Sequence, residues 1–275
     1  MRRQYKDIYM FASVLHREIR RSAGENGSVS YARRVDQELD RLPDDWARGL
    51  AIVAHPDDLE YGAASAIAAW TRGGKEVRYV LVTRGEAGID TVPPEECGPL
   101  RTEEQVRSAA VVGVETVEFL DHPDGLVQPS VELRRDLTAA IRRHRPEVIV
   151  SINHRDRWGA AGPFNHVDHR VVGVAVVDAV RDAANRWLFP ELGLDRWDGC
   201  RLVAFSGSSA PTHYVDVTDT IDLGVASLRE HATYLAALGG GDPGADPTAF
   251  LREHAVDAGA RVGCGAATLF EVVPC

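Results

Sequence analysis

Residues 50–60, with the sequence LAIVAHPDDLE, join a short apolar run to a polar turn. The run Leu50–Ala54 is continuous rather than alternating, which is typical of a strand that is buried on both faces of a sheet. Similar runs recur at 77–83, 114–120 and 147–152, with helical patterns between them. This alternation predicts right-handed βαβ units and an α/β fold, namely a Rossmann-like open, mostly parallel sheet with helices on both faces.

Glycine and proline indicate where the helices between these strands begin and end. One helix is expected to follow Pro56 and to end at Gly73-Gly74. A second is expected to begin near Thr102, with Gln105 placed for a capping box, and to stop at Gly113. The other expected elements are helices at about 131–144, 168–184, 221–238 and 249–262, and strands at 202–206, 213–217 and 269–273.

The residues before the first strand are predicted to form a helical extension. Apolar residues fall at helical spacing from Tyr5 to Ile19, and a second helical segment ends at the Leu42-Pro43-Asp44 turn. A signal peptide is not expected, because charged residues rather than a small-residue cleavage site follow the short apolar patch. We therefore expect an N-terminal helical extension at 1–47 and a single α/β domain at 48–275.

Composition excludes several classes of partner. The net charge of −10 argues against a nucleic-acid-binding surface, which normally carries a basic face. No apolar run is long enough to cross a bilayer, so we expect no membrane partner and a cytoplasmic location. The four cysteines lack CxxC spacing, which argues against a zinc cluster of cysteines and favours separate reduced thiols, although a disulfide stays open.

Carboxylates and histidines follow four of the predicted strands, at the point where each strand ends. Ligands of open α/β sheets bind outside the carboxyl ends of the strands, so these residues are expected to form one site. The four groups are 55–60, 84–86, 121–125 and 153–156, the last continued by 165–169.

His55 and Asp58 have the spacing of two metal ligands. They lie three residues apart across a strand-to-helix turn that Pro56 stiffens, so an imidazole nitrogen and a carboxylate oxygen can converge on one cation. A third ligand, for which His169 is the candidate, would complete a catalytic zinc site with an open fourth position. The alternative is that Asp57 and Asp58 only cap the helix while His55 is a buried core residue.

Several motifs in order carry a resemblance to a known family. They are Ala54–Glu60 with Gly62, Thr83–Gly88, Arg101–Glu104, Phe119–Gly125 and Asp168–Arg170. With them the chain resembles the LmbE-like (PIG-L) family of zinc-dependent deacetylases, closely over about residues 50–190 and loosely elsewhere. The resemblance implies that His55, Asp58 and His169 bind Zn²⁺, with one ion per chain.

The resemblance also implies catalytic roles. Asp57 would be the general base that takes a proton from water and returns it to the leaving amine. His166 would stabilise the oxyanion as an imidazolium, and Asp168 would orient one of the imidazoles. Many relatives have proline between this histidine and the aspartate, where this chain has Val167.

Five further residues are candidates for contact with the substrate. Arg101 and Asp124 match positions that contact sugar hydroxyls in relatives, and Glu86 is a weaker candidate of the same kind. His154 and Trp158 lie in or beside the loop at the mouth of the predicted site. The alternatives are a surface salt bridge for Arg101, a turn aspartate for Asp124 and a structural role in the loop for Trp158.

The resemblance implies hydrolysis of an N-acyl group, expected to be acetyl, on an amino sugar. The sugar would be N-acetylglucosamine attached to a larger acceptor, such as a glycopeptide pseudoaglycone or a thiol-cofactor precursor, and relatives favour a homo-oligomer. Two alternatives stay open: a two-metal phosphoesterase in which Asp57 shares a second ion with Asp121 or Asp156, and a non-catalytic metal-containing binding protein. A dinucleotide-binding oxidoreductase is excluded, since a glycine-rich loop does not follow the first strand.

Overall fold

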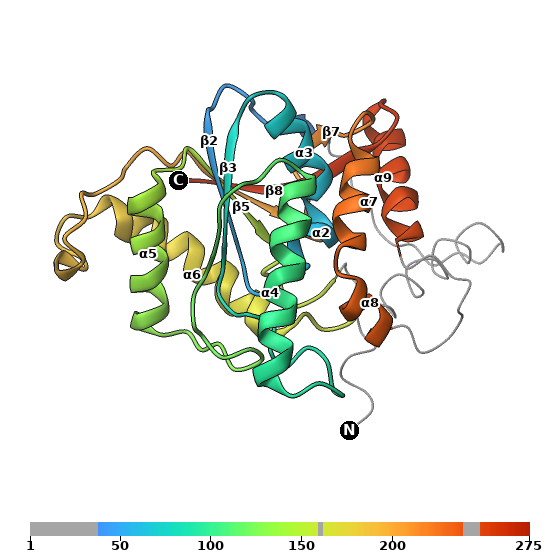
Figure 1. The fold of residues 1–275 in the computed structure, drawn as a ribbon. Coiled ribbons are helices and arrows are strands. Elements are labelled where there is room, and N and C mark those ends of the chain that lie inside the picture. The colour runs from blue at the N-terminus through green and yellow to red at the C-terminus, as the bar shows by residue number, and fades with distance from the viewer. Residues whose placement is uncertain (1–37, 159–161, 239–247) are drawn as a thin grey trace, which may run out of the picture.

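The computed structural model describes residues 38–158, 162–238 and 248–275. Eight strands in this part of the chain form one sheet, in the order β1-β7-β8-β6-β5-β2-β3-β4 (Figure 1). Neighbouring strands are parallel except β8, which is antiparallel to both β6 and β7. The predicted open, mostly parallel sheet is confirmed. The strands are β1 (Asp40–Arg41), β2 (Arg48–Val53), β3 (Glu76–Leu81), β4 (Val117–Phe119), β5 (Val148–Ile152), β6 (Leu202–Ser206), β7 (His213–Asp216) and β8 (Ala267–Pro274).

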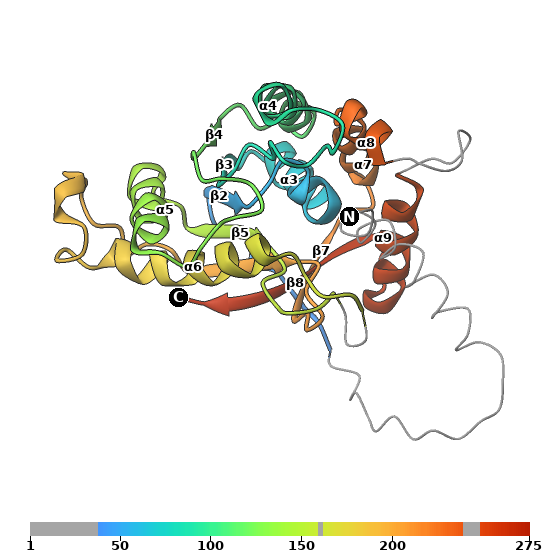
Figure 2. The same ribbon diagram turned by 90° about the horizontal axis from the view of Figure 1, so that it is seen from below.

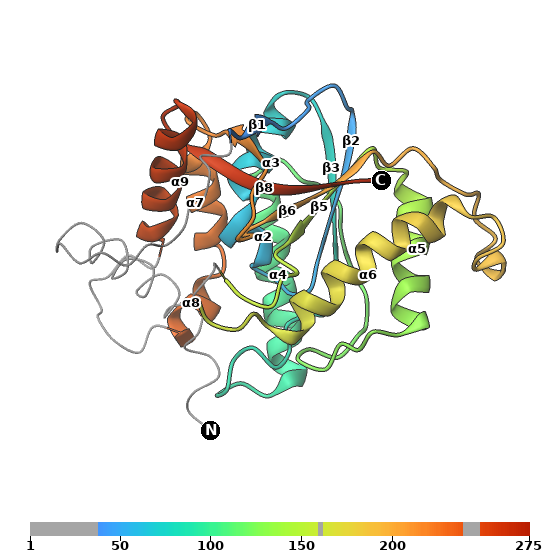
Figure 3. The ribbon, with the colours of Figure 1, turned by 180° about the vertical axis from the view of Figure 1, so that it is seen from behind.

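Helices cover both faces of this sheet, as expected. Figure 2 shows α5 and α6 on one face and α3, α4 and α7 on the other, and Figure 3 shows α5 beside α6 from behind. The helices are α2 (Asp58–Gly62), α3 (Ala64–Arg72), α4 (Pro94–Val111), α5 (Val131–His144), α6 (Val167–Ala184), α7 (Ile221–Arg229), α8 (Ala232–Leu238) and α9 (Ala249–Val262), with a short 3-10 helix at Pro190–Leu192.

The two faces of the central strands contribute to two separate hydrophobic cores. In β2, Leu50 and Ile52 pack in the core that contains α5 and α6, whereas Ala51 and Val53 pack in the core that contains α3. Successive side chains of a strand point to opposite faces, so a strand covered on both sides must be apolar at every position. This is the physical reason for the continuous apolar run that identified β2.

Three helix predictions need correction. The helix expected after Pro56 is divided at Ala63, where φ is −124°, into α2 and α3. The helix expected at 221–238 is likewise divided into α7 and α8. Helix α4 begins at Pro94 rather than near Thr102, so Gln105 lies inside the helix and the predicted capping box is wrong. Pro99 lies within α4. Proline cannot donate a helical hydrogen bond and is unusual inside a helix, so the sequence favoured a start after this residue.

The described part of the N-terminal extension is not helical. Asp40 and Arg41 form β1, which pairs in parallel with β7 at the edge of the sheet. Leu42 and Trp46 are buried, and Trp46 packs edge-on against Trp70 with 5.3 Å between ring centroids. Residues 38–47 therefore contribute a strand to the sheet and two side chains to its core, and the helix predicted to end at Leu42 is wrong for the described residues. The rest of the predicted extension lies outside the described residues.

Two other sequence expectations concern membranes and thiols. Among the residues that the structure describes, no helix has the length and apolar character needed to span a bilayer. All four cysteines are present as free thiols. The Sγ atoms of Cys200 and Cys275 lie 3.9 Å apart, where β6 and the end of β8 adjoin.

Candidate active site

The polar turn that follows β2 lies at the centre of the sheet edge. Strand β2 is paired with β3 on one side and with β5 on the other, so residues that follow these three strands meet here. The turn is tight: Asp57 has φ of 81°, in the left-handed region that favours glycine, asparagine and aspartate. Asp58 then begins α2. The side chain of Asp57 makes no capping hydrogen bond, so the helix-cap alternative does not account for this residue.

His55, Asp58 and His169 converge as the metal-site prediction requires. His55 Nδ1 lies 3.2 Å from His169 Nε2 and 3.7 Å from Asp58 Oδ2, and His169 Nε2 lies 2.9 Å from Asp58 Oδ1. A tetrahedral zinc ion with bonds of about 2.0–2.2 Å holds its ligand atoms about 3.3–3.6 Å apart. The three donor atoms are therefore spaced closely enough to bind one zinc ion after small adjustments.

The two neighbouring histidines stabilise the ionised form of Asp58, which is the form that binds a metal ion. Burial alone raises the pKa of Asp58, but His169 and His55 outweigh it and hold the pKa well below its usual range. Asp58 Oδ2 also accepts the backbone N–H groups of Ala54 and His55, at 3.1 and 2.9 Å. The carboxylate is thus held in place by the same turn that presents it.

The outer nitrogens of both histidines have hydrogen-bond partners that fix the ring orientation. His55 Nε2 lies 3.1 Å from Asp168 Oδ2, and His169 Nδ1 lies 2.9 Å from Asn165 Oδ1. Such outer partners set the tautomer and the basicity of metal-bound histidines. Asp168 therefore contacts His55, and its orienting role stays a prediction. Sequence reasoning did not single out Asn165, although its position four residues before His169 was an available signal.

Asp124 contacts His55, and Glu86 contacts the backbone of Asp124. Asp124 Oδ1 is 3.1 Å from His55 Nε2, and its side chain is only 7% exposed. Glu86 Oε1 accepts the backbone N–H of Asp124 at 2.8 Å. Both residues were predicted to contact substrate, and their contacts in the structure instead support His55 and the loop that carries Asp124.

Arg101 is buried next to Asp57, not on the surface. Its guanidinium donates to Asp57 Oδ2 at 3.1 Å and to the carbonyl oxygens of Pro56 and Gly85 at 2.7 and 3.1 Å, and it lies over the ring of Tyr234. Burial raises the pKa of the Asp57 carboxyl to about 6, although Arg101 opposes the rise. The predicted substrate contact of Arg101 and its surface salt-bridge alternative both disagree with this burial.

Gln105 and Glu60 are parts of the site that sequence reasoning missed. Gln105 Oε1 accepts the backbone N–H of Asp57 at 2.9 Å, and Gln105 Nε2 donates to Glu60 Oε1 at 2.9 Å. Gln105 follows Arg101 by four residues, so both side chains project from the same face of α4. The helical spacing from Arg101 to Gln105 was the signal that could have identified Gln105. Arg101 and Gln105 together hold the turn at Asp57, where the backbone is in the left-handed region.

His166 occupies the N-cap position of α6. Its Nδ1 accepts the backbone N–H of Asp168 at 3.2 Å, which leaves the ring proton on Nε2. Burial, together with the charges of the His55 and His169 imidazoles, lowers the pKa of His166 to about 4. This environment favours a neutral imidazole that donates through Nε2, rather than the imidazolium that the family resemblance implies.

The two candidates beside the mouth of the site have different surroundings. Trp158 packs edge-on against His169, with 5.9 Å between ring centroids, so it lies beside the ligand set. His154 packs against Phe205 at 4.3 Å and adjoins Gly173 of α6. Trp158 therefore adjoins the candidate ligand His169, whereas His154 contacts the core residue Phe205.

The second-metal alternative lacks its required neighbours. Asp121 has a side chain that is 85% exposed and pairs with Arg84, and Asp156 has a side chain that is 73% exposed and pairs with Arg170. Asp57 is buried against Arg101 instead. Neither aspartate thus shares a pocket with Asp57 in which a second ion would bind.

We expect the Arg101→Leu variant to lose about 3–5 kcal/mol of stability, because it removes the buried charge partner of Asp57 and the guanidinium donor to the Pro56 carbonyl oxygen. The matched control is Arg107→Leu on the same helix. Its exposed pair with Glu230 is worth about 0–1 kcal/mol. Urea unfolding of both variants gives the two free energies, and equal losses would show that the Arg101–Asp57 contact is not structurally important.

Comparison with known proteins agrees with this geometry. Residues 50–180 match the family described as PIG-L, GlcNAc-PI de-N-acetylase. The chain is 30% identical over 207 residues to diacetylchitobiose deacetylase of Thermococcus kodakarensis, which covers 72% of this chain and 74% of that protein. It is 25% identical over 256 residues to a 1D-myo-inositol 2-acetamido-2-deoxy-alpha-D-glucopyranoside deacetylase of a Mycobacterium species, covering 78% and 82%.

A solved structure shows the same relationship in three dimensions. The N,N'-diacetylchitobiose deacetylase of Pyrococcus horikoshii, in complex with its inhibitor, superposes with a TM-score of 0.74 at 26% identity. The superposition covers 84% of this chain and 85% of that one. Relatives that are named deacetylases hydrolyse N-acetyl amide bonds, and the match includes the segments that carry His55, Asp58 and His169. The chain belongs to the PIG-L family of de-N-acetylases and is an amide hydrolase of that family.

Proposed function

We propose that this enzyme is a zinc-dependent deacetylase that removes the N-acetyl group from an N-acetylglucosamine unit attached to a larger acceptor. The observation that carries the proposal is the convergence of His55 Nδ1, His169 Nε2 and the Asp58 carboxylate within 2.9–3.7 Å of one another. Two nitrogen donors and one carboxylate match the ligand set of a catalytic zinc site with an open position. The buried carboxylate of Asp57 lies in the same turn.

Each residue around this centre would have a separate role in amide hydrolysis. Zinc, when bound, would polarise the acyl carbonyl and lower the pKa of a water molecule. Asp57 would take the proton from the attacking water and deliver it to the leaving amine nitrogen. The Nε2–H group of His166 would donate a hydrogen bond to the developing oxyanion. Asp168 and Asn165 would keep the two ligand imidazoles in orientation.

The substrate class is inferred from the relatives. The diacetylchitobiose and inositol-linked deacetylases named above act on acetylated amino sugars that carry a further group. A glycopeptide pseudoaglycone and a thiol-cofactor precursor are the acceptors that we propose for this chain. The cytoplasmic location and the homo-oligomeric state stay predictions.

We expect the purified protein to contain one zinc ion per chain and to release amine from N-acetylglucosaminyl substrates. A chelator should abolish that release and added zinc should restore it, because the ligands hold the ion that activates the water. The assay combines elemental analysis with fluorescent detection of the amine. A phosphate ester serves as the parallel substrate, on which no phosphate release is expected.

Each other outcome favours a different alternative. Bound metal without amine release from any acylated amino sugar would favour a non-catalytic binding protein. Chelator-sensitive release of phosphate would favour the phosphoesterase.

A further inference from the structure

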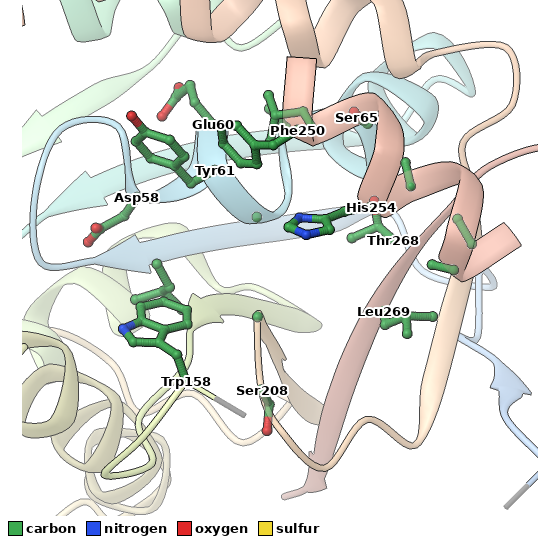
Figure 4. Close-up of a pocket in the computed structure, with 18 of the residues that line it drawn as sticks. Asp58, Glu60, Tyr61, Ser65, Trp158, Ser208, Phe250, His254, Thr268 and Leu269 are labelled. Atoms are coloured by element: carbon green, nitrogen blue, oxygen red, sulfur yellow. The ribbon is translucent and has the colours of Figure 1, made fainter. Parts of the chain in front are cut away.

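An apolar cavity opens directly from the proposed metal centre. It has a volume of about 340 Å³, and Asp58, His169 and Trp158 form part of its wall. From there it extends between α2, α9 and β8, and Figure 4 shows Asp58 and Trp158 at one end with Leu269 and Thr268 beyond His254. Much of the remaining wall is apolar, with side chains that include Ile152, Ile221, Leu251, Ala255, Ala258 and Leu269.

The position of the proton-transfer residues shows which part of an amide substrate points into this cavity. A substrate carbonyl at the metal centre has the acyl group on one side and the amine on the other. Asp57 must reach the amine nitrogen, and neither Asp57 nor His166 forms part of the cavity wall. The ligands Asp58 and His169 do line it. The amine therefore faces away from the cavity, and the acyl group faces into it.

The chemistry of the wall leads to the same assignment. An amino sugar carries hydroxyl groups, and burying them against apolar side chains without hydrogen-bond partners is costly. An alkyl chain gains free energy from the same burial, by a factor of about four in binding for each methylene. The apolar wall thus favours an alkyl chain over a sugar.

The size of the cavity exceeds what an acetyl group needs. A methyl group is comparable in size to a water molecule, which takes up about 30 Å³ in the liquid. A single methyl would therefore leave most of the 340 Å³ unfilled. At roughly 30 Å³ per carbon, 340 Å³ corresponds to about eleven carbons, so an alkyl chain of about six to ten carbons fits in the cavity.

We propose that this cavity is an acyl-chain site and that the enzyme accepts N-acyl amino sugars with medium-length chains in addition to, and in preference to, N-acetyl ones. The proposal rests on the proposed deacetylase function and extends its substrate class. The hydrolytic step is unchanged: water adds to the carbonyl carbon, the carbon–nitrogen bond breaks, and the products are a carboxylic acid and the free amine.

The first test is a chain-length series with the zinc-loaded enzyme. N-acetyl-, N-butanoyl-, N-hexanoyl-, N-octanoyl- and N-decanoyl-glucosamine are compared by amine release. We expect kcat/KM to rise about two- to fourfold per added methylene until the cavity is filled, and then to level off or fall. Octanoate, the product acid, should also bind measurably in calorimetry under conditions in which acetate does not.

Variants of α9 connect this preference to the cavity. Ala255→Leu narrows the cavity and should lower the octanoyl-to-acetyl ratio of kcat/KM at least tenfold, with acetyl turnover within threefold of wild type. Ala260→Leu, the same change at an exposed position of the same helix, is the matched control and should leave the ratio unchanged. If Ala255→Leu does not fold, Leu269→Asn makes the half-buried wall polar at nearly constant size and should lower the ratio and weaken octanoate binding.

The outcomes separate this proposal from the function on which it rests. No release from any acyl chain, acetyl included, would overturn the proposed function. Acetyl release with a steady decline toward longer chains would overturn the acyl-chain site alone. An octyl glycoside of N-acetylglucosamine tests the amine side of the substrate. If the enzyme prefers it over the methyl glycoside and loses that preference in Ala255→Leu, the cavity binds the aglycone and the acyl assignment is wrong.

Discussion

Replacing Asp57 by asparagine is expected to lower kcat by about 10²–10⁴-fold while the zinc content stays unchanged. The substitution removes the group that accepts and returns the proton. Asparagine tolerates the left-handed backbone conformation at φ of 81° and keeps an oxygen that can accept the hydrogen bond from Arg101. The variant should therefore fold and bind metal normally. Steady-state kinetics and elemental analysis of the same preparation measure the two quantities.

The control for this variant is Asp121→Asn, which makes the same chemical change at an exposed side chain near the same edge of the sheet. We expect it to retain full activity. Unchanged kcat in Asp57→Asn would exclude Asp57 as the general base. Loss of zinc from Asp57→Asn would instead place Asp57 among the ligands and revive the second-metal alternative.

His169→Ala is expected to release zinc and, with it, almost all activity. The variant removes one of three protein ligands, so its zinc affinity should fall by more than the roughly 10–100-fold that loss of an orienting partner costs. Asn165→Ala removes the hydrogen bond to His169 Nδ1 but no metal ligand, so its loss of zinc affinity should lie within that smaller range. The variant also loses the bonds from Asn165 Nδ2 to the carbonyl oxygens of Asn153 and Arg155 and the bond from the His166 N–H to Asn165 Oδ1. Competition with a metal chelator of known affinity gives the dissociation constants, and circular dichroism verifies the fold.

The same titration discriminates between two ligand sets. Ring nitrogens of His55, His166 and His169 also lie within 4.8 Å of one another, which makes a three-histidine site one geometric alternative. Because His166 Nδ1 accepts the amide of Asp168, we expect His166→Ala to keep its zinc and Asp58→Asn to lose it. The reverse pattern would establish the three-histidine set.

The residue sequence by itself determined the class of fold and predicted the centre of the candidate site. A strand buried on both faces must be apolar throughout, so β2 was evident as a continuous run, and the polar turn after it had to lie at the carboxyl end of a parallel sheet. His55, Asp57 and Asp58 were predicted as site residues for this reason. They are local in sequence, and a turn of four residues allows few conformations.

Only the tertiary structure decided the surroundings of that centre. Arg101, Asp124 and Glu86 were expected to contact substrate, yet in the structure they contact Asp57, His55 and the backbone of Asp124, respectively. A sequence gives the type of a side chain and its position along an element. It does not give the side of the site that the side chain faces, because that depends on how separate elements pack.

The cavity beside Asp58 is the clearest case of this limit. Its wall combines α2, the loop that carries Trp158, and the consecutive elements α9 and β8, which are three stretches far apart in the chain. Small residues such as Ala255 and Ala258 are ordinary for a buried helix face, and nothing in their local pattern distinguishes a packed core from an open pocket. The volume left between elements is a property of their packing, so it exists only in the folded protein.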